Sequence, residues 1–291
     1  MEIFEKLNLN FFFLLALSIF LIGGLLKYHE LTDEKGMVVS TKEVTASSAV
    51  ITKLSVSNIQ TASSIPVLMY HHIGELPKGS DQIRAGLTIS KDEFSQQLNQ
   101  LYNNGYRTVT LREFMNFLEY NESLPDKSIM ITFDDGYKDA FENAIPLLQE
   151  HSYKAVFAII TNFIDRPEYA TWGDVSLAYQ NGFDIVSHSQ THFDAYNVDA
   201  ERLREEMAQS RQDIFDHLYF WTDVFIYPFG HFTLEEEKIA SNLGFRAAFT
   251  TKPGLVSFGT NRFELPRVRV SPGSWKNTFD LILKKTPQKL D

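Results

Sequence analysis

Two pairs of ionisable side chains follow apolar segments, and their types suit a catalytic metal centre. Asp134 and Asp135 follow one apolar run, and His188, with His192 four residues later, follows another. One carboxylate and two imidazoles can bind a divalent metal and leave positions open for water. A second carboxylate beside them can serve as the general base for an attacking water. The sequence therefore predicts a metal-dependent hydrolase.

Simpler interpretations exist for both pairs. Asp-Asp-Gly after a strand is ordinary turn chemistry, and two histidines can lie in a polar surface loop. We favour metal binding because both pairs follow predicted strands. The four-residue spacing of His188 and His192 also predicts that both rings lie on one face of a helical turn.

Short apolar runs alternate with helical patterns from Ile65 onward. Strands are expected at 65–71, 106–110, 128–133, 155–160, 183–187, 224–227, 247–250 and 268–270. Helices are expected at 91–104, 111–120, 138–151, 172–181, 199–217 and 234–242. For the first helix, Ser90 is the expected N-cap and Glu93 stands at the capping-box position.

This alternation predicts an α/β fold, with a parallel sheet and crossover helices. Seven or eight such units favour a closed or nearly closed (β/α) barrel. Asp134, Asp135, His188 and the sequence Pro228-Phe229-Gly230 all follow predicted strands. The carboxyl ends of barrel strands form the face where active sites are built, so we expect these residues to meet there.

Composition excludes several classes of function. The chain has 291 residues, a net charge of -10 and no cysteine. A nucleic-acid partner is not expected, because phosphate binding needs a basic surface. Disulfides, thiolate catalysis and thiolate metal ligands are excluded by the lack of cysteine. We expect a monomer.

The N-terminal segment predicts a membrane anchor. Leu9–Leu26 is an apolar run without charge, at the shorter end of the length that spans a bilayer. We expect residues 1–30 to form an uncleaved signal-anchor helix, with a cleavable signal peptide as the alternative. Residues 31–64 are rich in Ser, Thr and Val and are expected to form a linker, which leaves residues 65–291 as the catalytic domain.

The motifs Thr132–Gly136 (TFDDG) and His188–His192 (HSQTH) resemble the first two motifs of the polysaccharide deacetylase family, the NodB-homology domain of carbohydrate esterase family 4. The resemblance covers about 65–271. It implies a distorted (β/α)7 barrel that removes N-acetyl groups from a polysaccharide.

The same resemblance implies the roles of the site residues. Asp134 would be the general base, while Asp135, His188 and His192 would bind the metal. Zinc is usual in the family, although these ligands also suit cobalt, nickel or iron.

The remaining motifs of the family are altered in this chain. The third motif usually contains an arginine that orients the base, but here it reads Ile226–Gly230 (IYPFG). Arg267 is the expected substitute. Trp172 loosely matches the tryptophan that forms a wall of the site in the family.

Sugar contacts are also expected from the altered third motif. Its residues Tyr227, Pro228 and Phe229 are predicted to line the substrate site. The backbone N–H of Phe229 is a candidate donor to the oxyanion.

A usual C-terminal histidine, the general acid of the family, is missing from this chain. His71, at the end of the first expected strand, is our preferred candidate for the acid or for a substrate contact, ahead of His231. The Met69-Tyr70-His71 sequence resembles the subgroup that deacetylates poly-β-1,6-N-acetylglucosamine of biofilm matrix.

We therefore expect a metal-dependent hydrolase that acts on an N-acetylglucosamine polymer outside the cell membrane. Peptidoglycan is the alternative substrate. An inactive, membrane-anchored carbohydrate-binding protein is the alternative of another class; it is disfavoured because Asp134 and all three expected ligands are present.

Overall fold

The computed structural model describes residues 61–285. The anchor expected at 1–30 and nearly all of the linker expected at 31–64 lie outside the described residues. Within 61–285, no helix combines the length and the apolar character needed to cross a bilayer.

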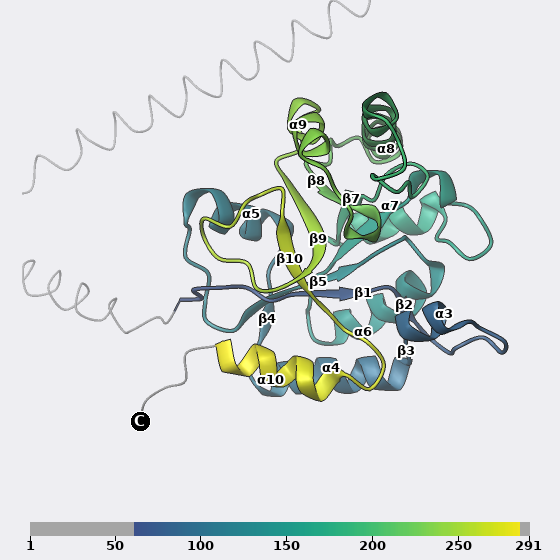
Figure 1. The fold of residues 1–291 in the computed structure, drawn as a ribbon. Coiled ribbons are helices and arrows are strands. Elements are labelled where there is room, and N and C mark those ends of the chain that lie inside the picture. The colour runs from purple at the N-terminus through teal and green to yellow at the C-terminus, as the bar shows by residue number, and fades with distance from the viewer. Residues whose placement is uncertain (1–60, 286–291) are drawn as a thin grey trace, which may run out of the picture. The chain divides into compact units, whose positions relative to one another are not determined.

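The main sheet is parallel, and seven of its eight strands close into a barrel (Figure 1). The ring runs β1 (Val67–Tyr70), β10 (Leu265–Arg269), β9 (Ala247–Pro253), β8 (Val224–Ile226), β7 (Asp184–Ser187), β6 (Val156–Ile159) and β5 (Ser128–Phe133). Pairing of β1 with β5 closes the ring, and the eighth strand, β4 (Arg107–Thr108), pairs with the start of β5. This arrangement confirms the predicted (β/α)7 barrel.

Eight helices accompany the strands within the described residues. They are α3 (Gln82–Leu87), α4 (Lys91–Asn103), α5 (Leu111–Tyr120), α6 (Ile145–Glu150), α7 (Trp172–Gln180), α8 (Ala200–Leu218), α9 (Leu234–Asn242) and α10 (Trp275–Lys285). A π-helical turn, Ala140–Ala144, precedes α6, and short 3-10 turns span Thr161–Phe163 and Pro228–Gly230. A separate two-stranded sheet pairs β2 (His72–Ile73) with β3 (Thr88–Ile89).

Side chains at the helix starts explain where two of the predicted helices begin. Ser90 accepts a hydrogen bond from the Glu93 backbone N–H and caps α4 as expected. The Glu93 carboxylate does not complete a capping box, because it accepts from the Gly273 backbone N–H. The complete capping box occurs instead at α5, between Thr110 and Glu113.

Alternation along the strands sends one set of side chains into the barrel. Apolar residues at these positions form one cluster with α5, including Val67, Met130, Val186 and Leu265. Two residues farther along, the same alternation leads to Met69, Thr132, His188 and Arg267. The polar residues of the predicted site therefore continue the inward rows at the carboxyl ends of the strands.

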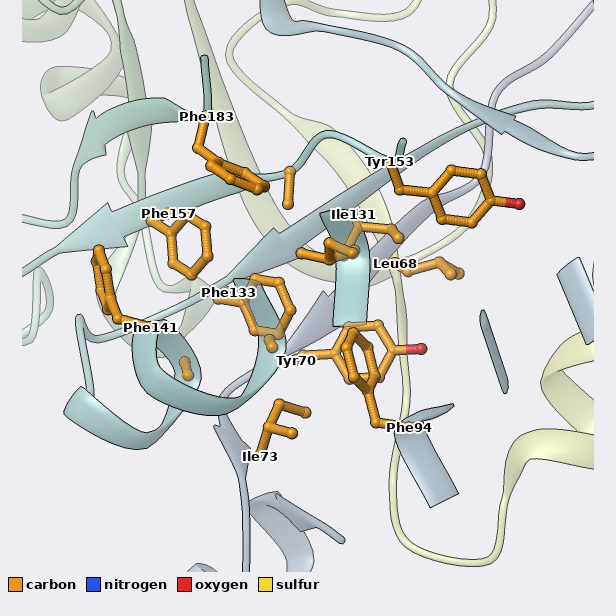
Figure 2. Close-up of a cluster of buried hydrophobic side chains, with 14 of the residues drawn as sticks. Leu68, Tyr70, Ile73, Phe94, Ile131, Phe133, Phe141, Tyr153, Phe157 and Phe183 are labelled. Atoms are coloured by element: carbon orange, nitrogen blue, oxygen red, sulfur yellow. The ribbon is translucent and has the colours of Figure 1, made fainter. Parts of the chain in front are cut away.

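The opposite set of side chains packs outward against the helices. Figure 2 shows the aromatic part of this layer, in which Phe133 stacks on Phe157 with ring centroids 4.9 Å apart. Phe141 packs on Phe157 at 4.5 Å, and Tyr70 lies beside Phe94 at 5.2 Å. Burying these large rings between sheet and helices removes much apolar surface from water and fixes the strand positions.

Helix α10 was not predicted from the sequence. It lies beside α4 (Figure 1), where the Trp275 indole N–H donates to Gln100 at 2.8 Å. Its buried residues Phe279 and Ile282 join the outer apolar layer. The helix covers strands that would otherwise expose apolar side chains.

Candidate metal centre and active site

The three predicted ligands meet at the carboxyl ends of β5 and β7. Asp135 Oδ1 lies 3.2 Å from His188 Nε2 and 3.4 Å from His192 Nε2. All three ligand atoms lie within 4.8 Å of one another. Two ligands held about 2.1 Å from a tetrahedral ion would be about 3.4 Å apart, so the spacing suits zinc.

The orientation of His188 leaves one ring nitrogen for a metal. His188 Nδ1 donates to the Ile226 carbonyl oxygen at 2.7 Å. A carbonyl oxygen can only accept, so Nδ1 carries a proton and Nε2 faces Asp135. Hydrogen bonding of the second nitrogen is the usual way in which proteins orient a metal-binding histidine.

Buried charge at Asp135 supports the fit to a cation. Asp135 Oδ1 is buried and, within the described structure, has no partner with hydrogen-bond geometry, although both imidazoles are near. Burial would raise the pKa of Asp135, but His188 and His192 hold it well below its ordinary value. Burial alone would lower the pKa of His188, but the two carboxylates raise it. The arrangement thus calls for positive charge in front of Asp135, which a divalent cation supplies.

The backbone between the two histidines corrects the prediction of a helical turn. Residues 188–192 form an irregular loop, with positive φ at Ser189 (67°) and His192 (58°). Ser189 Oγ accepts from the His192 backbone N–H at 2.9 Å. The imidazoles converge because this loop folds back on itself, so their four-residue spacing reflects no helix.

Glu206 on α8 supports the same loop and was not identified from the sequence. Its fully buried carboxylate accepts from the backbone N–H groups of Gln190 (3.0 Å) and Thr191 (2.8 Å) and from the Thr191 hydroxyl. Arg202, one turn earlier on α8, provides the balancing charge. The available signal was an acidic residue on the buried face of an amphipathic helix.

Arg267 of β10 pairs with Asp134, the predicted base. Its two terminal nitrogens donate to the two Asp134 carboxylate oxygens, each at 2.7 Å, and Nε donates to the Thr250 carbonyl oxygen. Both partners are buried, and β1 separates their strands in the sheet, so the pair crosses the barrel end. Burial would raise the pKa of Asp134, but Arg267 holds it below its ordinary value and keeps the carboxylate ionised.

His71 lies at the same end of the barrel as Asp134 and Asp135. It follows β1 and continues the inward row of Val67 and Met69. Burial lowers the pKa of His71, although the charges of Asp135 and Asp134 oppose this effect. Its position at the carboxyl end of β1 places His71 on the active face of the barrel.

The neighbouring His72 fixes this end of β1. It is buried, its Nδ1 lies 3.0 Å from Asp139 Oδ2, and its ring packs on Tyr137 with centroids 3.5 Å apart. Tyr137 follows the Asp-Asp-Gly sequence directly. These contacts tie the strand that bears His71 to the loop that bears Asp135.

The predicted sugar contacts divide into exposed and buried residues. Phe229 is 53% exposed, and its ring lies against His192 with centroids 4.4 Å apart. Trp172 is half-buried and stacks on His217 of α8 at 3.8 Å, so its proposed contact with substrate stays a prediction.

Two predicted contacts require correction. Tyr227 is fully buried in the cluster between the sheet and helices α8 and α9, and Pro228 is also buried. Since Ile226 points into the barrel, strand alternation turns Tyr227 outward. Tyr227 stacks on Phe232 at 5.1 Å and supports the turn from behind, without facing a substrate.

Comparisons with known proteins agree with this fold. The family model described as polysaccharide deacetylase matches residues 121–248. The Bacillus subtilis protein YxkH, named as a candidate polysaccharide deacetylase, is 31% identical over 76% of this chain and 77% of its own. Poly-beta-1,6-N-acetyl-D-glucosamine N-deacetylase of Staphylococcus epidermidis is 23% identical over 72% of this chain and 75% of its own. Among solved structures, Streptococcus pyogenes deacetylase PplD in complex with acetate has a TM-score of 0.71 and 26% identity, covering 78% of this chain and 100% of that one.

The chain belongs to the polysaccharide deacetylase family, whose members are hydrolases that remove N-acetyl groups. This result confirms both the resemblance of the two motifs and the predicted class of enzyme. His71 and Arg267 lie outside the region matched by the family model, and barrel closure brings them to the matched residues.

Proposed function

We propose that this enzyme is a metal-dependent deacetylase of poly-β-1,6-N-acetylglucosamine. One observation carries the proposal: the buried Asp135 oxygen faces two imidazoles, directly beside an Asp134 carboxylate that Arg267 keeps ionised. That arrangement combines a cation site with a general base at the active face of the barrel.

The proposed catalytic step divides the work among the chain's own residues. Asp135, His188 and His192 hold the cation, which when bound supplies Lewis-acid polarisation of water and of the acetyl carbonyl. Asp134 takes a proton from the attacking water, whose oxygen forms the new bond to the acetyl carbon. The C–N bond breaks, and acetate and a glucosamine unit result.

Departure of the amine requires a proton, which we assign to His71. The assignment is supported by its position at the carboxyl end of β1, on the inward row of Val67 and Met69. His231 is held by Asp194 at 3.0 Å and is assigned no part in proton transfer.

The substrate assignment is supported by the similarity to the Staphylococcus epidermidis poly-beta-1,6-N-acetyl-D-glucosamine N-deacetylase and by the altered third motif. An extracellular location at the cell membrane is proposed from the apolar run Leu9–Leu26, which lies outside the described residues. Peptidoglycan is the competing polymer, and the experiment below separates the two.

Acetate release from poly-β-1,6-N-acetylglucosamine and from peptidoglycan tests the proposal directly. The purified full chain is assayed with zinc, alongside Asp134→Asn and, as a matched control, Asp216→Asn on the exposed face of α8. We expect release from the first polymer, a loss of at least about 100-fold in Asp134→Asn, and no change in Asp216→Asn.

Chelation tests the cation requirement in the same assay. Removing divalent metal should abolish release, and adding back zinc, cobalt, nickel or iron separately should show which ion restores it. Release from peptidoglycan alone would keep the chemistry and change the substrate. No release from either polymer by the zinc-bound protein would overturn the proposed function.

A further inference from the structure

A chain of aromatic rings leads outward from the predicted metal ligand His192. Phe229 packs edge-on against His192 at 4.4 Å, and His231 lies 5.9 Å beyond Phe229. Tyr196 then stacks on His231 at 4.6 Å, with the ring planes 26° apart. The three outer rings come from the loops after β7 and β8, so they lie on the active face of the barrel.

The outer rings offer open apolar surface to solvent. Tyr196 is 63% exposed and Phe229 is 53% exposed. Exposed aromatic side chains that adjoin one another, next to a site that binds a ligand, are a common mark of a recognition surface. A flat, partly polar ring such as Tyr196 can stack on one face of a sugar and still hydrogen-bond at its edge.

Asp194 holds these rings in place before any ligand arrives. Asp194 Oδ1 lies 3.0 Å from His231 Nδ1 and accepts from the Tyr196 backbone N–H at 3.1 Å. Its other oxygen accepts from the Asn197 side chain at 3.0 Å. One carboxylate therefore fixes both the ring of His231 and the backbone that carries Tyr196. This preorganisation lowers the entropy that binding must spend on ordering these groups.

Phe229 is fixed by its backbone. It has a positive φ of 59°, and its carbonyl oxygen accepts from the Thr251 hydroxyl at 3.2 Å. A non-glycine residue in this conformation costs free energy and persists where the surroundings determine it. The turn thus presents the ring between His192 and the outer pair.

We propose that Tyr196, His231 and Phe229 form a stacking platform for the sugar unit next to the one that is deacetylated. The inference rests on the proposed function, because the position of the reacting unit is set by Asp135 and His192. Phe229 separates the metal site from Tyr196, so Tyr196 contacts a neighbouring unit of the polymer. The enzyme then recognises a chain of N-acetylglucosamine units, and a single unit occupies only part of the site.

Chain-length dependence of turnover tests the platform. The full chain with zinc is assayed on β-1,6-linked N-acetylglucosamine oligomers from the disaccharide to the pentasaccharide. The variants are Tyr196→Ala and Tyr196→Phe. Tyr120→Ala is the matched control, because Tyr120 has a similar exposed fraction (67%) but does not belong to the platform. It lies at the end of α5, the helix that packs with the inward apolar cluster.

For the wild type, kcat/KM should rise with oligomer length. In Tyr196→Ala the ratio of pentasaccharide to disaccharide kcat/KM should fall about tenfold, mainly through KM, since one stacking contact is worth about that factor. Tyr196→Phe should keep the ratio because it keeps the ring, and Tyr120→Ala should match the wild type. An unchanged ratio in Tyr196→Ala, or an equal loss at every length, would overturn the platform while leaving the proposed function intact.

A binding measurement on a variant without turnover distinguishes failure of the platform from failure of the proposed function. Calorimetric titration of the pentasaccharide into Asp134→Asn should give about tenfold weaker binding when Tyr196→Ala is added. If the wild type releases no acetate but this binding difference appears, the proposed function fails and the platform stands as a sugar-binding surface. No difference in pentasaccharide affinity would overturn the platform, and its surface would then be tested against a protein partner.

Discussion

Replacing Arg267 with alanine should both destabilise the fold and disable the base. Arg267 is fully buried and makes two 2.7 Å hydrogen bonds to Asp134, besides those to the Thr250 carbonyl and the Thr132 hydroxyl. Its removal leaves the Asp134 carboxylate buried without a counter-charge. The remaining acceptors would also lose a donor in a space that water enters with difficulty.

Two estimates give the expected loss in the free energy of unfolding. Opposite charges about 4 Å apart attract by about 4 kcal/mol at an effective dielectric constant of about 20. Breaking a buried ion pair by removing one partner typically costs about 3–5 kcal/mol. We therefore expect Arg267→Ala to lower the free energy of unfolding by about 3–5 kcal/mol. A base displaced by about 1 Å should also reduce acetate release by at least about 100-fold.

Urea denaturation and acetate release measure the two effects on the same proteins. Arg267→Lys serves where the alanine variant folds poorly; it keeps the charge but loses the two-pronged contact, so an intermediate effect is expected. Arg269→Ala is the control for stability, because Arg269 is on the same strand with an exposed side chain. Its unfolding free energy should change by less than about 0.5 kcal/mol.

A double-mutant cycle shows whether the pair is the cause. In the Asp134→Asn background no buried carboxylate is left unpaired, so Arg267→Ala should cost less, by at least about 1 kcal/mol. Equal costs in both backgrounds would mean that Arg267 acts through packing. An Arg267→Ala variant with near-normal stability and wild-type acetate release would refute the reasoning altogether.

Two further predictions concern a glycine turn and a buried acid. Gly230→Ala should destabilise the folded state by about 3 kcal/mol and lower acetate release, because a Cβ there would clash with the Thr251 side chain and backbone. Gly259 also has a positive φ, but its Cβ would point into open space, so Gly259→Ala should cost only about 1 kcal/mol. Thermal denaturation of both variants measures the difference. Burial raises the pKa of Glu236 to about 8, with a weaker opposing effect of the Thr233 backbone N–H, so the folded state keeps a proton that the unfolded chain releases. The free energy of unfolding should therefore fall by up to about 5 kcal/mol as pH rises from about 4.5 to 8, and the loss should be much smaller in Glu236→Gln. Coincident urea curves at the two pH values for the wild type would contradict this.

The site was largely readable from the sequence wherever local patterns determine structure. Asp134, Asp135 and His188 each follow an apolar run, and the carboxyl ends of parallel barrel strands share one face whatever the details of packing. Most helix positions followed from periodicity, and the caps at Ser90 and Thr110 follow from side-chain chemistry within one turn.

One correction was also within reach of the sequence. Counting the alternation from Val224 places Ile226 inside the barrel and Tyr227 outside, which the structure confirms. The resemblance to the third family motif predicted that Tyr227 contacts the substrate, whereas the alternation of the strand predicts that its side chain faces the core. A two-residue period is local and could have decided the matter.

Contacts between distant segments depended on the tertiary structure alone. Arg267 reaches Asp134 only because β1 closes the ring between β10 and β5, and the register of that closure is set by packing of the whole barrel. The convergence of His188 and His192 depends on left-handed backbone at Ser189 and on Glu206 of α8, which binds the backbone of the next two residues. The sequence specifies which groups lie at the end of a strand. The partners of those groups depend on barrel closure, strand register and loop conformation. These features are fixed by many weak contacts that act together.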